Sequence, residues 1–504
     1  MKPEDIIDAM NNIDDNVIDE VKNKANPKEK GNVWIKWVAV AACFCIVIGA
    51  VLGHFHFNPP EQVIDSNTTV NTQNQQKNPV LGSFSVAKAS YPAMVKYPVE
   101  TDFDNGNGEL DWKAFSDAYD KWNADAERRQ ANVAQADKYS HFFTTTTKTF
   151  FADTKGENLV YSPVNVYMAL SMLAESTDGQ TRKQILDLLG TNDITSLRTL
   201  ANKLWLSNYT DDGLKTNILA NSVWLRDGVN YNKSTLELLA EKYYASTFSG
   251  LMGSDEYNKA LQNWLNEQTG GLLKEQANEV EFNDSTVLGL ASTVYFKGGW
   301  QDEFPDYLTK ADTFYSTKEN EITDFMYQRN PQLPLYADDR FTATSLSFKG
   351  SGKMWLILPD EGVTPESLIQ KGDINPILNG ATPKKEINSV IVNLYMPKFD
   401  VASSVDLIDS IKTLGVSDVF DETKADFSPI MPNERAYVSQ INHSARVTVD
   451  EKGCTAAAFT VIGVDTESAP MGEEIEFKLN RPFVFVITSD DSTPLFVGVV
   501  NTVK

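Results

Sequence analysis

The spacing of apolar residues changes along this chain of 504 residues. From about residue 136 onward, apolar positions first recur every three or four residues, which is the period of one helix face. That pattern predicts four early helices, at 139–151, 164–175, 181–189 and 234–244. Toward the C-terminus, runs dominated by Val, Ile and Phe predict strands, at 446–449, 481–487 and 494–500. No internal repeat is present and helices are mixed with strands, so residues 136–504 are expected to form an α+β domain with antiparallel or mixed sheets.

One segment between two of these strands has the length of a strand but consists mostly of small residues. Residues 453–464 contain no charge and no proline, so nothing in the segment blocks sheet pairing. Because side chains alternate between the two faces of a strand, every second residue from position 454 would share one face. That face carries Cys454, Ala456, Ala458, Thr460, Ile462 and Val464. An ordinary buried strand also accounts for this composition, and an acidic stretch containing a proline follows at 465–470.

Seven short motifs, in order along the chain, resemble segments of the serpin family. The hinge-like run EKGCTAAA begins at Glu451, and NRPFVF follows at 480–485. The other five are NLVYSP at 158–163 with ALSML at 169–173, VYFKGGW at 294–300, LILPDE at 356–361, MPKF at 396–399 and LGVSDVF at 414–420. One such match is weak evidence, whereas seven in the expected order argue strongly against a chance similarity.

The resemblance covers most of the chain and implies the serpin fold for residues 136–504. That fold has three β-sheets, about nine helices and an exposed reactive-centre loop, here at about 450–476. The loop offers a bait bond to a peptidase, and at the acyl-enzyme stage the cut loop inserts into the central sheet and traps the enzyme. The protein is therefore expected to be an irreversible suicide inhibitor of extracellular serine peptidases, with cysteine peptidases as a second class of target.

The resemblance assigns the loop hinge and the bait bond to individual residues. The hinge comprises Glu451, Gly453, Cys454, Thr455, Ala456, Ala457 and Ala458. The family's spacing of fourteen residues beyond Gly453 places the bait bond at Glu467–Ser468, with Thr466 and Asp465 as alternatives one and two residues earlier. A glutamate bait suits a glutamyl-specific peptidase, whereas Thr466 suits an elastase-like pocket for small side chains. Asp465 would suit an aspartate-specific peptidase.

The resemblance also implies a polar latch at the point where the main sheet opens, formed by Ser162, Asn165, Ser292 and His443. His443 matches a buried histidine of the family, and Ser162 matches one of its hydrogen-bonding partners. Asn165 stands where Ser is common, and Ser292 lies at the start of a motif that usually begins Asn-Ala. The hinge also differs from the usual sequence of the family, since Cys454-Thr455 stands where a Thr-Glu pair is common. Both replacements are small and uncharged, so inhibition is still expected.

No feature of the chain predicts enzymatic activity. It contains no G-x-S-x-G elbow, no H-E-x-x-H motif and no glycine-rich phosphate loop. Cys454 is a conceivable nucleophile, but a small side chain filling a buried strand position accounts for it better. The net charge of −24 argues against nucleic acid as a partner, because phosphate binding requires a clustered basic surface. The three cysteines, Cys43, Cys45 and Cys454, provide no disulfide framework, and no metal or cofactor is expected.

The N-terminal region predicts a membrane anchor. Residues 33–53 are apolar apart from Lys36, and their uncharged part of about 17 residues would span ~25 Å as a helix. Lysines gather before this segment and the next basic residue is Lys77, which predicts a cytoplasmic N-terminus. Residues 1–32 are expected to form an acidic amphipathic tail, and the helical spacing within positions 1–22 leaves three roles open: docking of a cytoplasmic partner, self-association, or none.

Two regions lie between the anchor and the domain. Residues 54–84 are expected to be a disordered spacer, and residues 85–135 an N-terminal extension that packs on the domain, as in some bacterial serpins. A monomeric serpin domain would then lie outside a bacterial cell on a single-pass anchor, or be secreted if the anchor is cleaved. Two other functions stay open. One is a non-inhibitory serpin serving as a binding module, and the other is a transmembrane sensor that reports loop cleavage to the tail.

Overall fold

The computed structural model describes residues 79–106, 109–130, 136–350, 352–454 and 472–504. The chain divides into two compact units, 1–65 and 66–504, and the described residues all belong to the second. The predicted tail and the predicted anchor at 33–53 lie outside the described residues. Within the described ranges, no helix is both long enough and apolar enough to cross a membrane.

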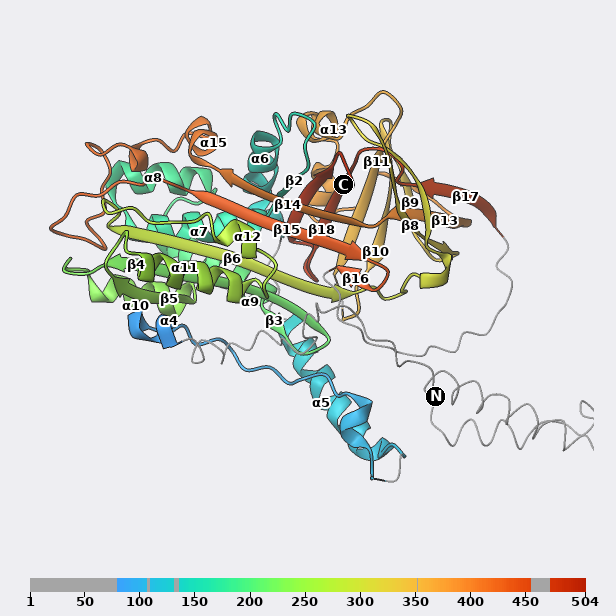
Figure 1. Cartoon of the computed structure of the whole chain (residues 1–504), viewed down its shortest axis with the longest axis horizontal. Coiled ribbons are helices and arrows are strands. Elements are labelled where there is room, and N and C mark those ends of the chain that lie inside the picture. Colours follow the sequence, from blue (N-terminus) through green and yellow to red (C-terminus); the bar gives the residue numbers. More distant parts are fainter. Residues whose placement is uncertain (1–78, 107–108, 131–135, 351, 455–471) are drawn as a thin grey trace, which may run out of the picture. The chain divides into compact units, whose positions relative to one another are not determined.

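The largest of three sheets has eight strands and includes the start of the predicted hinge (Figure 1). One of its central strands, β4, is buried along nearly its whole length, as expected for a strand that is covered on both faces. The strand predicted at 446–449 is confirmed as part of β15. In spatial order the strands are β1 (Ser85–Ala87), β5 (Ala245–Gly250), β4 (Lys215–Arg226), β6 (Leu288–Gly299), β16 (Gly453–Cys454), β15 (Asn442–Asp450) and β14 (Phe399–Asp406), with β3 (Thr210–Asp211) beside β4.

A seven-stranded sheet supplies much of the hydrophobic core. Every residue of its strands β18 and β19 is buried, which explains why their sequence reads as nearly continuous apolar runs. The strands predicted at 481–487 and 494–500 are therefore confirmed. In spatial order the strands are β12 (Lys385–Ile387), β9 (Leu335–Ala337), β10 (Phe341–Ser347), β11 (Lys353–Pro359), β18 (Phe483–Thr488), β19 (Pro494–Val500) and β2 (Leu159–Tyr161).

The third sheet has four strands, and its strand β17 begins within the last residues of the predicted loop. Its strands are β17 (Glu473–Lys478), β13 (Val390–Pro397), β8 (Asn320–Asn330) and β7 (Lys310–Tyr315), in that order. The pair β13–β17 is parallel, whereas β13–β8 and β7–β8 are antiparallel. The sheet is thus mixed, as the sequence predicts.

Twelve α-helices accompany the sheets in the described part of the chain, ten of them within 136–504. The four predicted helices are confirmed as α6, α7, α8 and α10, whereas α9 and α11 were not predicted. The helices are α4 (Pro79–Phe84), α5 (Trp112–Gln130), α6 (Ser140–Phe150), α7 (Pro163–Ser176), α8 (Gly179–Leu188), α9 (Ile194–Asn208), α10 (Lys233–Lys242), α11 (Asp255–Gln268), α12 (Lys274–Ala277), α13 (Pro365–Lys371), α14 (Asn375–Leu378) and α15 (Ile408–Thr413). Short 3₁₀ helices are η2 (Glu100–Phe103), η3 (Ala136–Tyr139), η4 (Asp306–Leu308) and η5 (Asp418–Phe420).

The region predicted as an N-terminal extension contacts the rest of the unit at several places. Strand β1 pairs with β5 and so covers the edge of the large sheet. The ring of Tyr91 lies 5.1 Å from that of Trp205 on α9. On α5, Trp122 Nε1 donates a hydrogen bond to Asp212 Oδ2 at 3.2 Å. These contacts join the extension to the β3–β4 hairpin and to one edge of the sheet.

The end of the predicted spacer at 54–84 requires a correction. Its last six residues form helix α4 instead of an irregular segment. Leu81 is buried, and the ring of Phe84 lies 5.0 Å from that of Tyr257 on α11. Composition does not reveal this helix, because six residues acquire an apolar binding surface only when distant parts of the chain have folded.

Candidate functional site

The large sheet is parted between β6 and β15. Among the residues that the structure describes, the two strands are joined through the two-residue strand β16, in which Gly453 pairs with Gly299 and Asp450, and Cys454 pairs with Gly298 and Val449. Beyond these pairs, the facing edges at 288–297 and 442–448 have no partner strand among the described residues. Unpaired strand edges expose rows of N–H and C=O groups, so the slot is a template for one more strand.

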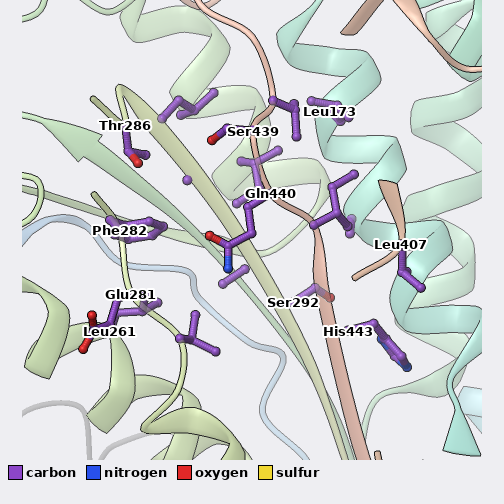
Figure 2. A pocket seen from close by; sticks show the side chains of 18 of the residues that line it. Leu173, Leu261, Glu281, Phe282, Thr286, Ser292, Leu407, Ser439, Gln440 and His443 are labelled. Atoms are coloured by element: carbon purple, nitrogen blue, oxygen red, sulfur yellow. The ribbon is translucent and has the colours of Figure 1, made fainter. Parts of the chain in front are cut away.

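A cavity of about 260 Å³ occupies the end of this slot that lies away from β16, where residues 288–293 of β6 face His443 and Ser444 of β15. Its floor is apolar and comes mostly from α7 and α11, through Val166, Leu170, Leu173, Leu261 and Leu265. Figure 2 shows Ser292 and His443 toward one end of the cavity and Thr286 and Ser439 toward the other. An inserted strand that followed this cavity would therefore bury one face against helices and meet polar groups at a defined depth.

The structure brings the four predicted latch residues together. The backbone N–H of Ser162 donates to His443 Nε2 at 3.1 Å, which links α7 to β15. The Asn165 Nδ2 amide donates to the Ser292 carbonyl oxygen at 3.0 Å, which links α7 to β6. Helix α7 positions both groups, because Ser162 is its N-cap and Ser162 Oγ accepts the Asn165 N–H at 3.3 Å. The N-terminus of α7 thus holds the two parted strands, and the role of the four residues as a latch stays a prediction.

His443 is neutral in this site. Its side chain is 5% exposed, and burial lowers the pKa of the imidazole to about 4. The contact with the Ser162 N–H requires Nε2 to be unprotonated, so the ring proton belongs on Nδ1. Protonation would place a donor against a donor and bury a charge, which opposes the bridge between α7 and β15.

Two hydroxyl groups on β6 lack hydrogen-bond partners. Ser292 Oγ and Thr293 Oγ1 are buried and have no partner within the part of the chain that the structure describes. A buried hydroxyl without a partner costs roughly 1–3 kcal/mol. Both residues line the cavity. The parted sheet therefore carries the unfavourable free energy of these hydroxyl groups, which an inserted residue that bonds to them could remove.

The start of the hinge is anchored by an ion pair and by backbone contacts. Lys398 Nζ lies 2.7 Å from Glu451 Oε1, and Thr309 Oγ1 donates to the same oxygen at 2.7 Å. Burial alone would raise the pKa of Glu451, but the hydrogen bonds from Lys398 and Thr309 outweigh it and lower the pKa. Trp300 adds two bonds, from its backbone N–H to the Lys452 carbonyl and from Nε1 to the Asp450 carbonyl, both 2.9 Å long.

Gly453 and Cys454 enter the slot under tight steric limits. A Cβ at Gly453 would lie 2.3 Å from the Gly298 carbonyl oxygen, so only glycine fits at this crossing. The Cys454 side chain is 1% exposed and belongs to the hydrophobic core. This burial explains why a small apolar residue suits the position.

The remaining loop residues lie outside the described residues. They are the hinge residues Thr455, Ala456, Ala457 and Ala458 and the bait residues Asp465, Thr466, Glu467 and Ser468. The loop predicted at about 450–476 overlaps ordered strands at both ends, since Asp450 ends β15 and Glu473 begins β17.

The sequence and the fold both match known proteins. A family model described as "Serpin (serine protease inhibitor)" matches residues 137–503. The chain belongs to the serpin family. Serpin-Z2B of wheat, Triticum aestivum, is 30% identical over 361 residues, which cover 68% of this serpin and 90% of the wheat protein.

Solved structures share the fold. Native tengpin, a thermophilic serpin, gives a TM-score of 0.65 at 23% identity and covers 73% of this serpin and 94% of its own chain. Thyroxine-binding globulin complexed with thyroxine gives a TM-score of 0.63 at 20% identity, covering 73% and 99%. The serpin fold with three sheets is therefore confirmed, and the described part of 136–504 has ten α-helices where about nine were predicted. Serpins are peptidase inhibitors at the level of the family, yet a thyroxine-binding relative shows that the fold alone does not determine mechanism.

Sequence reasoning missed the residues that hold the hinge. Lys398 and Trp300 lie inside the motifs MPKF and VYFKGGW, which identified the family but suggested no role for either side chain. Thr309 lies in no motif. The signal for Lys398 was present, since a lysine retained between proline and phenylalanine at a strand junction requires an acidic partner if its surroundings are partly buried.

Proposed function

We propose that this serpin inhibits serine peptidases irreversibly by inserting its cut reactive-centre loop between β6 and β15. The observation that carries the proposal is β16, because the first two residues of the insertable segment already pair with both strands. The facing edges beyond them have no partner strand in the described part of the chain. A segment continuing from Cys454 would complete the backbone pairing of both edges.

The register of β16 predicts which loop residues meet the latch. Each loop residue after Cys454 moves one position back along both β6 and β15, so Thr460 would lie opposite Ser292 and His443. The Thr460 hydroxyl would then lie beside the unpartnered Ser292 Oγ. Insertion would thereby offer a partner to a group that lacks one, in addition to pairing the strand edges.

The small hinge residues suit this path. Ala456 and Ala458 would share the core-facing side of the inserted strand with Cys454, which is already buried. A charged residue at any of these positions would be buried without a partner as the strand entered the sheet. The hinge is thus compatible with rapid insertion, which an inhibitory serpin needs before the acyl-enzyme hydrolyses.

The target class follows from the bait residues. The family spacing supports Glu467–Ser468 as the cleaved bond, with Thr466 or Asp465 as alternatives. These assignments favour serine peptidases with glutamyl, small-residue or aspartyl specificity, and cysteine peptidases form a second class. Trypsin-like enzymes are disfavoured, because their primary pocket carries a carboxylate that would repel an acidic bait.

The cellular location belongs to the same proposal. An apolar segment at 33–53 with lysines before it supports a single-pass anchor with the serpin domain outside the cell, and cleavage of the anchor would release the domain. Bacterial origin and a cytoplasmic partner for residues 1–22 are further parts of this proposal. Protease accessibility on intact cells, with and without lysis, measures the orientation directly.

The deciding experiment incubates the full chain, in mild detergent, with glutamyl-specific, elastase-like and trypsin-like serine peptidases. A covalent complex that survives a denaturing gel is expected with the first or second enzyme. Mass spectrometry of the released C-terminal peptide is expected to show Ser468 at its start. Cleavage of the loop without a covalent complex would instead identify a substrate-like serpin, in agreement with the binding-module alternative.

A further inference from the structure

The chain after the proposed bait bond is too short to let a bound peptidase lie far from β17. Glu473, the first residue of β17, follows Ser468 by five residues. Five extended residues reach at most about 17 Å. On the N-terminal side of the bond, Glu467 follows Cys454 by thirteen residues, which corresponds to a reach of about 45 Å. A peptidase that holds this bond is therefore tied closely to β17 and only loosely to the hinge.

The sheet beside this tether presents one continuous face built from three strands, β8, β13 and β17, which lie together at one end of the described unit (Figure 1). In the strand register, Asn393 of β13 lies between Arg329 of β8 and Glu476 of β17. Two residues further along β13, Tyr395 lies next to Tyr327 of β8. Residues that pair in register point to the same side of the sheet, so these side chains share the outward face.

The side chains of this face are held in place before any partner binds. The rings of Tyr327 and Tyr395 lie 4.8 Å apart, and the Tyr327 hydroxyl donates to Asn393 Oδ1 at 2.8 Å. Arg329 donates twice to Glu474 Oε1, at 3.1 and 3.0 Å, and Asn393 Nδ2 donates to Glu474 Oε2 at 3.2 Å. Half-exposed tyrosines and arginine are typical of protein interfaces, and an ordered network loses little conformational entropy on binding.

The charge on this face is negative where it is not neutralised. Arg329 is paired with Glu474, and Lys478 Nζ is paired with Asp312 Oδ2 at 2.7 Å. Glu476 is exposed and forms no hydrogen bond or close ion pair within the described ranges, although its charge helps to raise the pKa of nearby Lys478; Glu473 at the strand start is also exposed. Since the bait itself is acidic, both the loop and its neighbouring sheet favour a basic surface on the partner.

We propose that the outward face of β8, β13 and β17 is a second docking surface for the target peptidase. It selects enzymes that carry basic residues on the primed side of the active-site cleft, which is the side that holds residues after the cleaved bond. The proposal rests on the proposed function for the presence of a peptidase at the loop. It adds a contact that acts on the rate of attack, before trapping is decided.

The test measures the second-order rate of attack on the loop, counting covalent complex and cleaved chain together. The full chain and its variant Glu476→Lys are compared with a glutamyl-specific and an elastase-like serine peptidase at several salt concentrations. The matched control is Glu237→Lys on α10, which changes the net charge equally at the other end of the described unit (Figure 1). With the enzyme that attacks the wild type faster, Glu476→Lys is expected to slow attack about three- to tenfold at low salt. The difference is expected to shrink as salt is raised.

Each outcome separates the docking surface from the inhibitory function. Equal rates for the wild type and Glu476→Lys, or equal losses in both lysine variants, would overturn the docking surface. Attack without trapping would overturn inhibition alone, because the rate comparison still measures the surface. If neither enzyme attacks the wild-type loop, both proposals fail.

Discussion

At the hinge end of the slot, backbone pairs join β6 to β15 through β16, whereas at the latch end two hydrogen bonds, each between a side chain and a backbone group, connect the two strands to α7. The hinge end combines strand pairs with the Lys398–Glu451 ion pair. The latch end depends on one hydrogen bond from Asn165 and one to His443, over an open cavity. Hydrogen bonds of this kind contribute roughly 1 kcal/mol each, so the latch end is the weaker of the two.

This difference indicates an order of events. In the proposed mechanism, insertion would start where the strand is already paired and would proceed toward the end where the sheet is held by few bonds. The hinge end would then determine whether the loop can enter, and the latch end would determine how easily the sheet admits the rest. Variants at the two ends are therefore expected to change different observables.

The largest effect is expected from Cys454→Arg at the hinge end. The side chain is already buried in β16, so arginine would have to bury a charge without a partner or separate β16 from both neighbouring strands, and either effect opposes insertion of the loop. Covalent complex on a denaturing gel is expected to disappear, and the loop is expected to be cleaved as a substrate. Cys454→Ala is the control and should retain trapping. A complex formed by Cys454→Arg in normal yield would contradict this account of the hinge.

The next effect is acid destabilisation through His443 at the latch end. Its folded pKa of about 4 lies below the usual 6.5, so the unfolded state binds the proton more readily. The contribution of His443 to the free energy of unfolding is therefore fully present above about pH 6.5. As the pH falls toward 4, roughly 3 kcal/mol of it is lost. Thermal denaturation across this range, for the wild type and His443→Gln, isolates the contribution. Parallel pH profiles for the two proteins would show that His443 does not supply it.

A smaller effect is expected from Asn165→Ala, which removes the bond to the Ser292 carbonyl oxygen. We expect the free energy of unfolding to fall by about 1–2 kcal/mol. Inhibitory activity should also be lost faster on warming, because β6 is less firmly held. Residual trapping activity after timed incubation measures this. Asn123→Ala is the control, since its amide bonds only to Glu127 on an exposed helix face. Equal inactivation rates for both variants would exclude a special role for Asn165.

The smallest effect is expected from Lys398→Met at the hinge end. Lys398 is partly exposed, so its ion pair with Glu451 is worth about 1 kcal/mol or less. A double-mutant cycle with Glu451→Gln, followed by thermal denaturation, measures the coupling. A coupling of zero would mean that the backbone pairs of β16 hold the hinge end without help from this pair.

Much of the fold was predictable because apolar spacing and family motifs agree. Strands β18 and β19 and helices α6, α7, α8 and α10 follow directly from their apolar patterns. Helix α11 was missed although Tyr257, Ala260, Leu261, Trp264 and Leu265 recur at helical spacing, so its apolar face could have been predicted from the sequence. The four residues assigned to the latch were found through the resemblance, since no periodicity connects Ser162, Asn165, Ser292 and His443.

By itself, the sequence determined the family, the hinge with its small residues, and the spacing that leads to Glu467. These are local properties of composition and order. Only the tertiary structure decided, for the residues that it describes, that β6 and β15 are parted, that β16 pairs with both, and that Ser292 Oγ lacks a partner there. Those features depend on strands separated by about 150 residues in sequence meeting at one slot, and local sequence carries no information on such distant pairing.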